Sequence, residues 1–146
     1  MSGKSDPSME FASADWLDFL HKLLVARAAV SVDPTAPRVI CEVYRKAPRH
    51  LAPSGRLAWT RRLENGRIDF TLEECSDAEA DVKLVGDYAV LAPLARLLVR
   101  PGDEHVFAAR MQAAISSGTL EVVRDRRDPE APRDFTLHNM LAAVTR

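Results

Sequence analysis

The sequence predicts an α/β domain of the layered α+β kind, in which helices cover one face of a mostly antiparallel sheet of four to five strands. Three observations predict this class. Two segments of alternating polar and apolar residues flank Asn65-Gly66, the preferred dipeptide of a two-residue hairpin turn. Five other segments repeat apolar residues at the helical period, and two short β-branched segments lie among them. The apolar helical residues outnumber what a small sheet face can cover, and this surplus leaves room for a cavity.

Length and composition favour one globular domain. The chain has 146 residues, and we expect a disordered tail over 1–12, with Met9 as a possible native start, and a single domain over 13–146. A formal net charge of -1 provides no positive field for nucleic acid. Cys41 and Cys75 stand in unrelated contexts and predict neither a disulfide framework nor a zinc site. No apolar run approaches the ~20 residues of a membrane span, so we expect a cytoplasmic protein without a transmembrane segment.

Two helices are predicted before the hairpin. The first covers 13–30, where apolar residues follow the 3.6-residue period and acids precede bases. The second covers about 37–47 and would bury Val39, Ile40, Val43 and Tyr44. Pro48 would end it, because the residue before a proline avoids the helical region.

The hairpin spans 56–75 and places apolar pairs on one face and opposite charges on the other. The two-residue turn fixes the register, and the expected cross-strand pairs are Leu63–Ile68, Trp59–Leu72, Arg62–Asp69, Glu64–Arg67 and Arg61–Phe70. Arg61 is the exception on the apolar face.

The remaining elements alternate between strand and helix. A third strand is predicted over 81–86, and Asp87 would cap a helix that Pro93 bends or divides. Another helix is predicted over 105–115, a fourth strand over 119–125, and a closing helix near the C-terminus.

Motifs for catalysis are weak. Asp15, Asp18 and His21 share a helical face, which suits a general base, but an exposed charged face explains them more simply. Asp69, Glu73 and Glu74 could hold a metal, yet Arg62 is a simpler partner for Asp69. The sequence contains no G-x-S-x-G elbow and no glycine-rich phosphate loop. We therefore expect no catalytic residue, no metal and no cofactor.

Three motifs carry a family resemblance over residues 56–125. They are the turn Asn65-Gly66, the strand ADVKL from Ala80 to Leu84, and GTLEV from Gly118 to Val122. Together with the helices between them they resemble the sterol carrier protein 2 domain family. The resemblance implies an apolar tunnel between helices and sheet that binds a hydrophobic molecule without catalysis.

The expected function is binding of a fatty acyl chain, an isoprenoid or quinone intermediate, or a sterol-like molecule, with transfer of that molecule left open. The expected ligand-binding residues are Trp59, Ile68, Phe70, Leu72, Leu91, Leu94, Leu98, Phe107, Met111, Ile115, Met140 and Leu141. Arg61 or Arg110 could meet a carboxylate or phosphate at the mouth, or form a surface ion pair.

Two other functions stay open. The first is an accessory module that binds a protein partner in a lipid or quinone biosynthetic complex. The second is an enzyme of the ketosteroid-isomerase kind, although that fold needs several long strands after its helices and only 119–125 follows them here.

Overall fold

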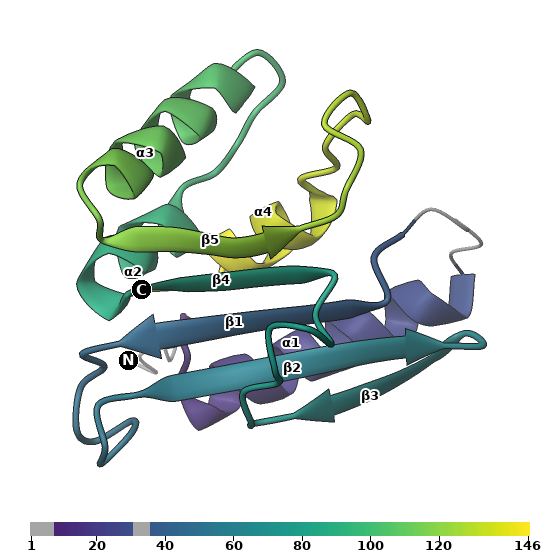
Figure 1. Cartoon of the computed structure of the whole chain (residues 1–146), viewed down its shortest axis with the longest axis horizontal. Coiled ribbons are helices and arrows are strands. Elements are labelled where there is room, and N and C mark those ends of the chain that lie inside the picture. Colours follow the sequence, from purple (N-terminus) through teal and green to yellow (C-terminus); the bar gives the residue numbers. More distant parts are fainter. Residues whose placement is uncertain (1–7, 31–35) are drawn as a thin grey trace, which may run out of the picture.

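The fold is a five-stranded sheet with helices on one face (Figure 1). The computed structural model describes residues 8–30 and 36–146. The strand order is β3-β2-β1-β4-β5, and every neighbouring pair is antiparallel except the parallel pair of β1 and β4. The elements in chain order are α1 (Ala14–Val30), β1 (Val39–Arg45), β2 (Leu57–Glu64), β3 (Arg67–Thr71), β4 (Val82–Asp87), α2 (Tyr88–Arg96), α3 (Glu104–Ser116), β5 (Leu120–Asp125) and α4 (Thr136–Ala142). The predicted class is confirmed, and the sheet is mixed.

The segment predicted as a second helix is instead the central strand β1. Its side chains alternate between two buried environments: Ile40 and Tyr44 pack with the helices, while Cys41 and Val43 pack on the opposite face. A strand buried on both faces is apolar along its length, so a helical spacing of apolar residues arises within it by chance. The prediction of a helix over 37–47 was wrong.

The hairpin follows the predicted register for four of its five pairs. Asn65 and Gly66 both have positive φ, 51° and 74°, as a type I′ turn requires. The fifth pair, Trp59 with Leu72, does not form, because β3 ends at Thr71 and the Leu72 side chain is 61% exposed. Arg62 lies opposite Asp69 as expected, but its guanidinium pairs with Glu79 at 2.6 Å.

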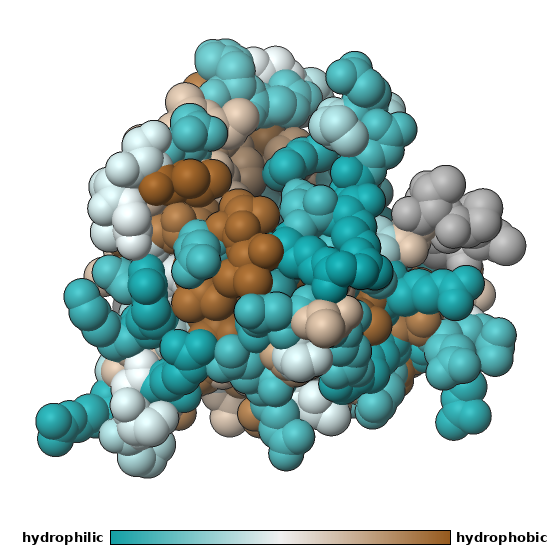
Figure 2. Space-filling model, viewed as in Figure 1, coloured by the Kyte–Doolittle hydropathy of each residue, from teal (hydrophilic) through white to brown (hydrophobic). Residues whose placement is uncertain are grey.

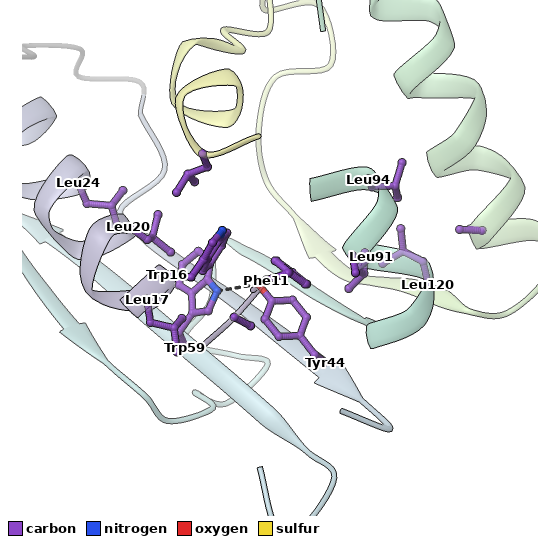
Figure 3. Close-up of a cluster of buried hydrophobic side chains, with 14 residues drawn as sticks. Phe11, Trp16, Leu17, Leu20, Leu24, Tyr44, Trp59, Leu91, Leu94 and Leu120 are labelled. Carbon is purple, nitrogen blue, oxygen red and sulfur yellow. Dashed lines mark hydrogen bonds between the residues drawn. The ribbon is translucent and has the colours of Figure 1, made fainter. Parts of the chain in front are cut away.

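The main core lies between α1 and the sheet (Figure 3). Four residues of α1 are buried there: Trp16, Leu17, Leu20 and Leu24. Phe11 packs its ring 5.0 Å from the rings of both Trp16 and Tyr44. The Trp59 ring nitrogen donates a 2.8 Å hydrogen bond to the Tyr44 hydroxyl, as the dashed line in Figure 3 shows.

The chain ends are joined in this core. Phe11 is 3% exposed, the Met9 nitrogen donates to the Val144 carbonyl, and the Trp16 ring nitrogen donates to the Thr145 hydroxyl. Residues 8–12 of the predicted tail are therefore part of the folded domain. Residues 1–7 lie outside the described residues. A helical or strand period cannot identify a short buried segment of this kind.

Residues 72–81, which we call the strap, connect β3 to β4 across the face of the sheet that carries no helices (Figure 1). Lys83 reaches the strap from β4 with its side chain 3% exposed. Its ammonium group donates to Glu74 at 2.9 Å, to Asp77 at 2.8 Å and to the Cys75 carbonyl at 2.7 Å. The strap is thus fixed by a buried cation.

Helix α2 begins directly after β4 and lies close to it. At Gly86 an added Cβ would come within 2.9 Å of the Leu91 side chain and 3.0 Å of the Leu120 side chain, so the glycine permits this approach. Asp87 occupies the N-cap position, but its carboxylate pairs with Arg45 at 3.1 Å instead of capping the helix. Pro93 lies within the single helix α2, which ends at Arg96.

Candidate functional site

The helices cover the two halves of the sheet unequally. Helix α1 packs tightly on the half that contains β3, whereas α3 lies beyond the β5 edge and diverges from β5 after their connection (Figure 1). Ala114 is the buried residue of α3, and its Phe107 and Met111 are half-buried. On the helix-facing surface of β5, Val122 remains 39% exposed, next to the half-buried Leu84 of β4. We call this part, defined by Leu84, Met111 and Val122, the open half.

Glu42 borders the open half from the centre of the sheet. It lies opposite Trp59 on β2 and opposite Leu84 on β4, so its side chain shares their helix-facing side. Its hydrogen bond is a long one, 3.5 Å from the Tyr44 hydroxyl to Oε1. Burial raises the pKa of the Glu42 carboxyl to about 7, although the Tyr44 hydrogen bond and the charges of Arg127 and Arg61 oppose the rise. This carboxyl therefore changes its protonation state near neutral pH.

Arg61 lies close to Glu42 on the same side of the sheet. It is partly buried opposite Ile40 on β1 and opposite Phe70 on β3. Within the described part of the chain its guanidinium forms no hydrogen bond and no ion pair. Burial lowers the pKa of its guanidinium, and the like charge of Arg27 lowers it further. The Arg27 side chain is itself held by Asp134 at 3.0 Å.

An aromatic cluster connects α3 to α4. The rings of Phe107, Phe135 and His138 lie 5.0 to 6.0 Å apart in edge-to-face arrangements. His138 contacts the Leu97 carbonyl at 2.6 Å, and the Asn139 amide exchanges two 2.8 Å hydrogen bonds with the Val99 backbone. The open half is therefore bounded by a firmly attached α4.

The structure divides the predicted ligand-binding residues into three groups. Trp59, Leu91, Leu94 and Leu141 are buried core residues. Ile68, Phe70, Phe107 and Met111 are half-buried around that core. Leu72, Leu98, Ile115 and Met140 are exposed. The hairpin residues lie toward the β3 edge and the α3 residues toward the β5 edge, while the buried and half-buried groups belong to or pack against one hydrophobic cluster.

Two surface cavities are polar. One, of about 230 Å³, is lined by Ala36, Pro37, Arg38, Asp81, Arg126 and Arg127. The other, of about 320 Å³, lies on the strap side and is lined mainly by charged residues that include Arg45, Arg56, Lys83 and Glu121. Neither is the apolar tunnel that the sequence resemblance implies. On the uncovered face of the sheet, apolar surface gathers where α3 meets β5 (Figure 2).

Sequence reasoning missed Glu42 because it placed the residue on a helix. In a helix that turns Val39, Ile40, Val43 and Tyr44 inward, Glu42 falls outside the apolar stripe, whereas in a central strand it must face one of two packed layers. The signal was available in VICEVYR, where Glu42 interrupts the apolar residues between Val39 and Tyr44.

Other sites were also considered. In the described residues no group of three or more His, Cys, Asp or Glu side chains is arranged to hold a metal ion. No helix in that part of the chain combines the length and apolar character needed to cross a bilayer. His21, one of the candidate bases, stacks on Phe70 with ring centroids 5.0 Å apart.

Comparison with known proteins gives neighbours in structure only. No family model matches the chain, and no curated protein matches it. A solved structure described as possibly a sterol carrier protein, from Thermus thermophilus, matches at 16% identity and TM-score 0.48, over 98% of this chain and 96% of that one. The crystal structure of sterol carrier protein 2 matches at 17% identity and TM-score 0.46, over 92% and 96%. A ubiquinone synthesis protein named UbiJ-SCP2 matches at 16% identity and TM-score 0.40, over 88% and 90%. These neighbours bear the name of the family that the sequence motifs resemble, and at such identities the likeness is one of fold alone.

Proposed function

We propose that the protein binds a hydrophobic small molecule non-covalently, without chemical change, in the open half between α3 and the sheet. The observation that carries the proposal is Val122, an apolar residue on the helix-facing surface of the sheet whose side chain remains 39% exposed. Leu84 beside it and Met111 on α3 are only half-buried. An apolar chain laid against these side chains would remove their remaining surface from water.

The energetics suit a long or polycyclic ligand. Each CH₂ group buried contributes ~0.8 kcal/mol, so a long apolar chain gains several kcal/mol without a polar contact. Fatty acyl chains, isoprenoid or quinone intermediates and sterol-like rings all meet this requirement. Micromolar affinity, about -8 kcal/mol, is the expected scale.

A titration with an environment-sensitive apolar probe tests the proposal. We expect saturable binding with a negative heat-capacity change and little dependence on salt, because burial drives it. Val122→Trp should weaken binding by at least about tenfold, or 1.4 kcal/mol. Val25→Trp is the matched control, because Val25 is a similarly exposed valine on α1. Absence of saturable binding, or equal loss in both variants, contradicts the proposal.

A protein-binding module is the second candidate. Four large apolar side chains are exposed on α3, on α4 and in the connection between α2 and α3, and such exposure also suits a protein partner: Leu98, Val106, Ile115 and Met140. Native mass spectrometry of protein purified without detergent, followed by lipid extraction, separates the two. Bound small molecules favour the first candidate, and stoichiometric protein without extractable lipid favours the second.

A further inference from the structure

Glu42 and Arg61 are adjacent charged residues on the helix-facing side of the sheet. Arg61 is opposite Ile40, two residues before Glu42 on β1, so the two side chains are diagonal neighbours on paired antiparallel strands. Diagonal neighbours of this kind lie about 7–8 Å apart, within reach of long side chains. Their charges affect each other, since each lies among the causes of the other's shifted pKa.

Neither side chain has a close partner among the described residues. The Glu42 carboxyl has one 3.5 Å contact, with the Tyr44 hydroxyl, and the Arg61 guanidinium has no hydrogen bond or ion pair with any of them. Other partly buried charges are paired closely: Lys83 with Glu74 and Asp77, Arg127 with Asp125, and Arg45 with Asp87. A partly buried guanidinium and carboxyl without close partners are costly unless a third group meets them.

We propose that Glu42 and Arg61 form a headgroup site that binds the carboxylate of an amphipathic ligand together with one proton. The guanidinium of Arg61 donates to the ligand carboxylate, whose planar oxygens match its fork of N–H groups. Glu42 takes the proton from solvent and, as a neutral carboxyl, donates the second hydrogen bond. The ligand's apolar chain lies along the open half, so this inference rests on the proposed function.

The register of the sheet provides the path for that chain. Val122, Leu84 and Glu42 lie side by side on three neighbouring strands. Glu42 and Val122 are thus two strand spacings, about 10 Å, apart on one surface. A chain that begins at the headgroup site would cross Leu84 and reach Val122 at the open edge.

The charges around Glu42 make proton uptake the expected response. Two carboxyl groups that share a site cannot both stay ionised, so one holds a proton. The ligand carboxylate is stabilised by Arg61, which leaves the proton on Glu42. The groups that face this position are Tyr44 on β1, Arg61 on β2, Asp125 on β5 with its partner Arg127, and Arg27 on α1 with its partner Asp134. Burial raises the pKa of Glu42 to about 7, so its neutral form is already populated near neutral pH.

The test compares two probes of equal chain length, dodecanoate and 1-dodecanol, by calorimetry at pH 6 and pH 8. Dodecanoate should bind about tenfold more weakly at pH 8, because the free energy needed to protonate Glu42 at that pH reduces the binding free energy. Dodecanol should bind equally at both values. Calorimetry in two buffers of different ionisation enthalpy should show uptake of about one proton per dodecanoate at pH 8.

Two variants locate the effect. Glu42→Gln should bind dodecanoate equally at both pH values, and Arg61→Gln should weaken dodecanoate by at least about tenfold while leaving dodecanol unchanged. Arg67→Gln, at the exposed first residue of β3, is the matched control. The buffer comparison uses the unaltered protein, so a variant that fails to fold does not prevent the test. Dodecanoate binding without a pH dependence, or without proton uptake, overturns the inference and leaves the proposed function standing. Failure of both probes to bind overturns the proposed function itself.

Discussion

Glu42 places a free-energy cost on the folded state that depends on pH. Its pKa of about 7 in the folded protein lies above the ordinary value of 4.5, so between these values the folded state retains a proton that the unfolded state releases. The contribution of this proton to the free energy of unfolding is fully present below about pH 4.5. It is lost as the pH rises through 7. Above pH 7 the loss amounts to about 3 kcal/mol.

Replacement of this carboxyl by an amide should therefore stabilise the protein at high pH. We expect Glu42→Gln to increase the free energy of unfolding by about 2–3 kcal/mol at pH 8 and to change it little at pH 4.5. Urea unfolding at the two pH values measures the difference. Glu73→Gln is the control, because Glu73 is exposed. An equal effect of Glu42→Gln at both pH values would show that ionisation of the carboxyl does not destabilise the folded protein.

Single residues were the hardest level to predict from the sequence. Cys41 and Cys75 were placed in unrelated contexts, yet both are buried in one small cluster with Val43, Ala80 and Val85. The two cysteines are far apart in the sequence, and the path of the strap across the sheet brings them into one cluster. No local pattern contains that information.

At the level of elements, the local signals predicted well. The hairpin turn, β4, α3 and β5 lie within one or two residues of the predicted ranges, because turn chemistry and periodicity act over a few neighbours. The β1 segment was the exception. It is central and buried on both faces, and such a strand lacks the alternation that separates strands from helices.

The strap depends on one buried side chain. Burial would lower the pKa of Lys83, but hydrogen bonds with Asp77 and Glu74 outweigh this effect and raise it, so the group stays charged. We expect Lys83→Met to destabilise the protein by about 1–3 kcal/mol, because the Cys75 carbonyl and the Asp77 carboxylate lose their donor and Glu74 keeps only its bond from Arg56. Amide hydrogen exchange over residues 72–81 should rise more than over the β2–β3 hairpin.

The control for this change is Lys46→Met, since Lys46 is largely exposed and lies 3.7 Å from Asp87. It should alter neither stability nor exchange. If exchange over the strap were unchanged in Lys83→Met, the strap would be held by its other contacts, such as the Arg124 bonds to the carbonyls of Asp77 and Ala78.

For the whole molecule, the class of fold was predictable and the pairing at the centre of the sheet was not. The hairpin and α3 lie at opposite edges because β1 and β4 pair in parallel between them. That pairing joins segments about forty residues apart, and no turn signal specifies it. The expected wall of Ile68, Phe70 and Leu72 and the expected wall of α3 consequently lie toward opposite edges of the sheet.

A pair of tryptophan substitutions distinguishes core from binding surface across the molecule. Leu94 is 6% exposed within the main core, so Leu94→Trp should overpack it and cost ~1–3 kcal/mol. Met111 is half-buried on α3, and Met111→Trp can extend over the open half, so the melting temperature should change little while apolar probe binding is lost. Measuring both quantities in both variants tests this assignment. If Leu94→Trp blocked binding and kept its melting temperature, the space for ligand would lie beneath α2, where the sequence alone had placed it. If Met111→Trp lowered the melting temperature and bound probe normally, α3 would be part of the core.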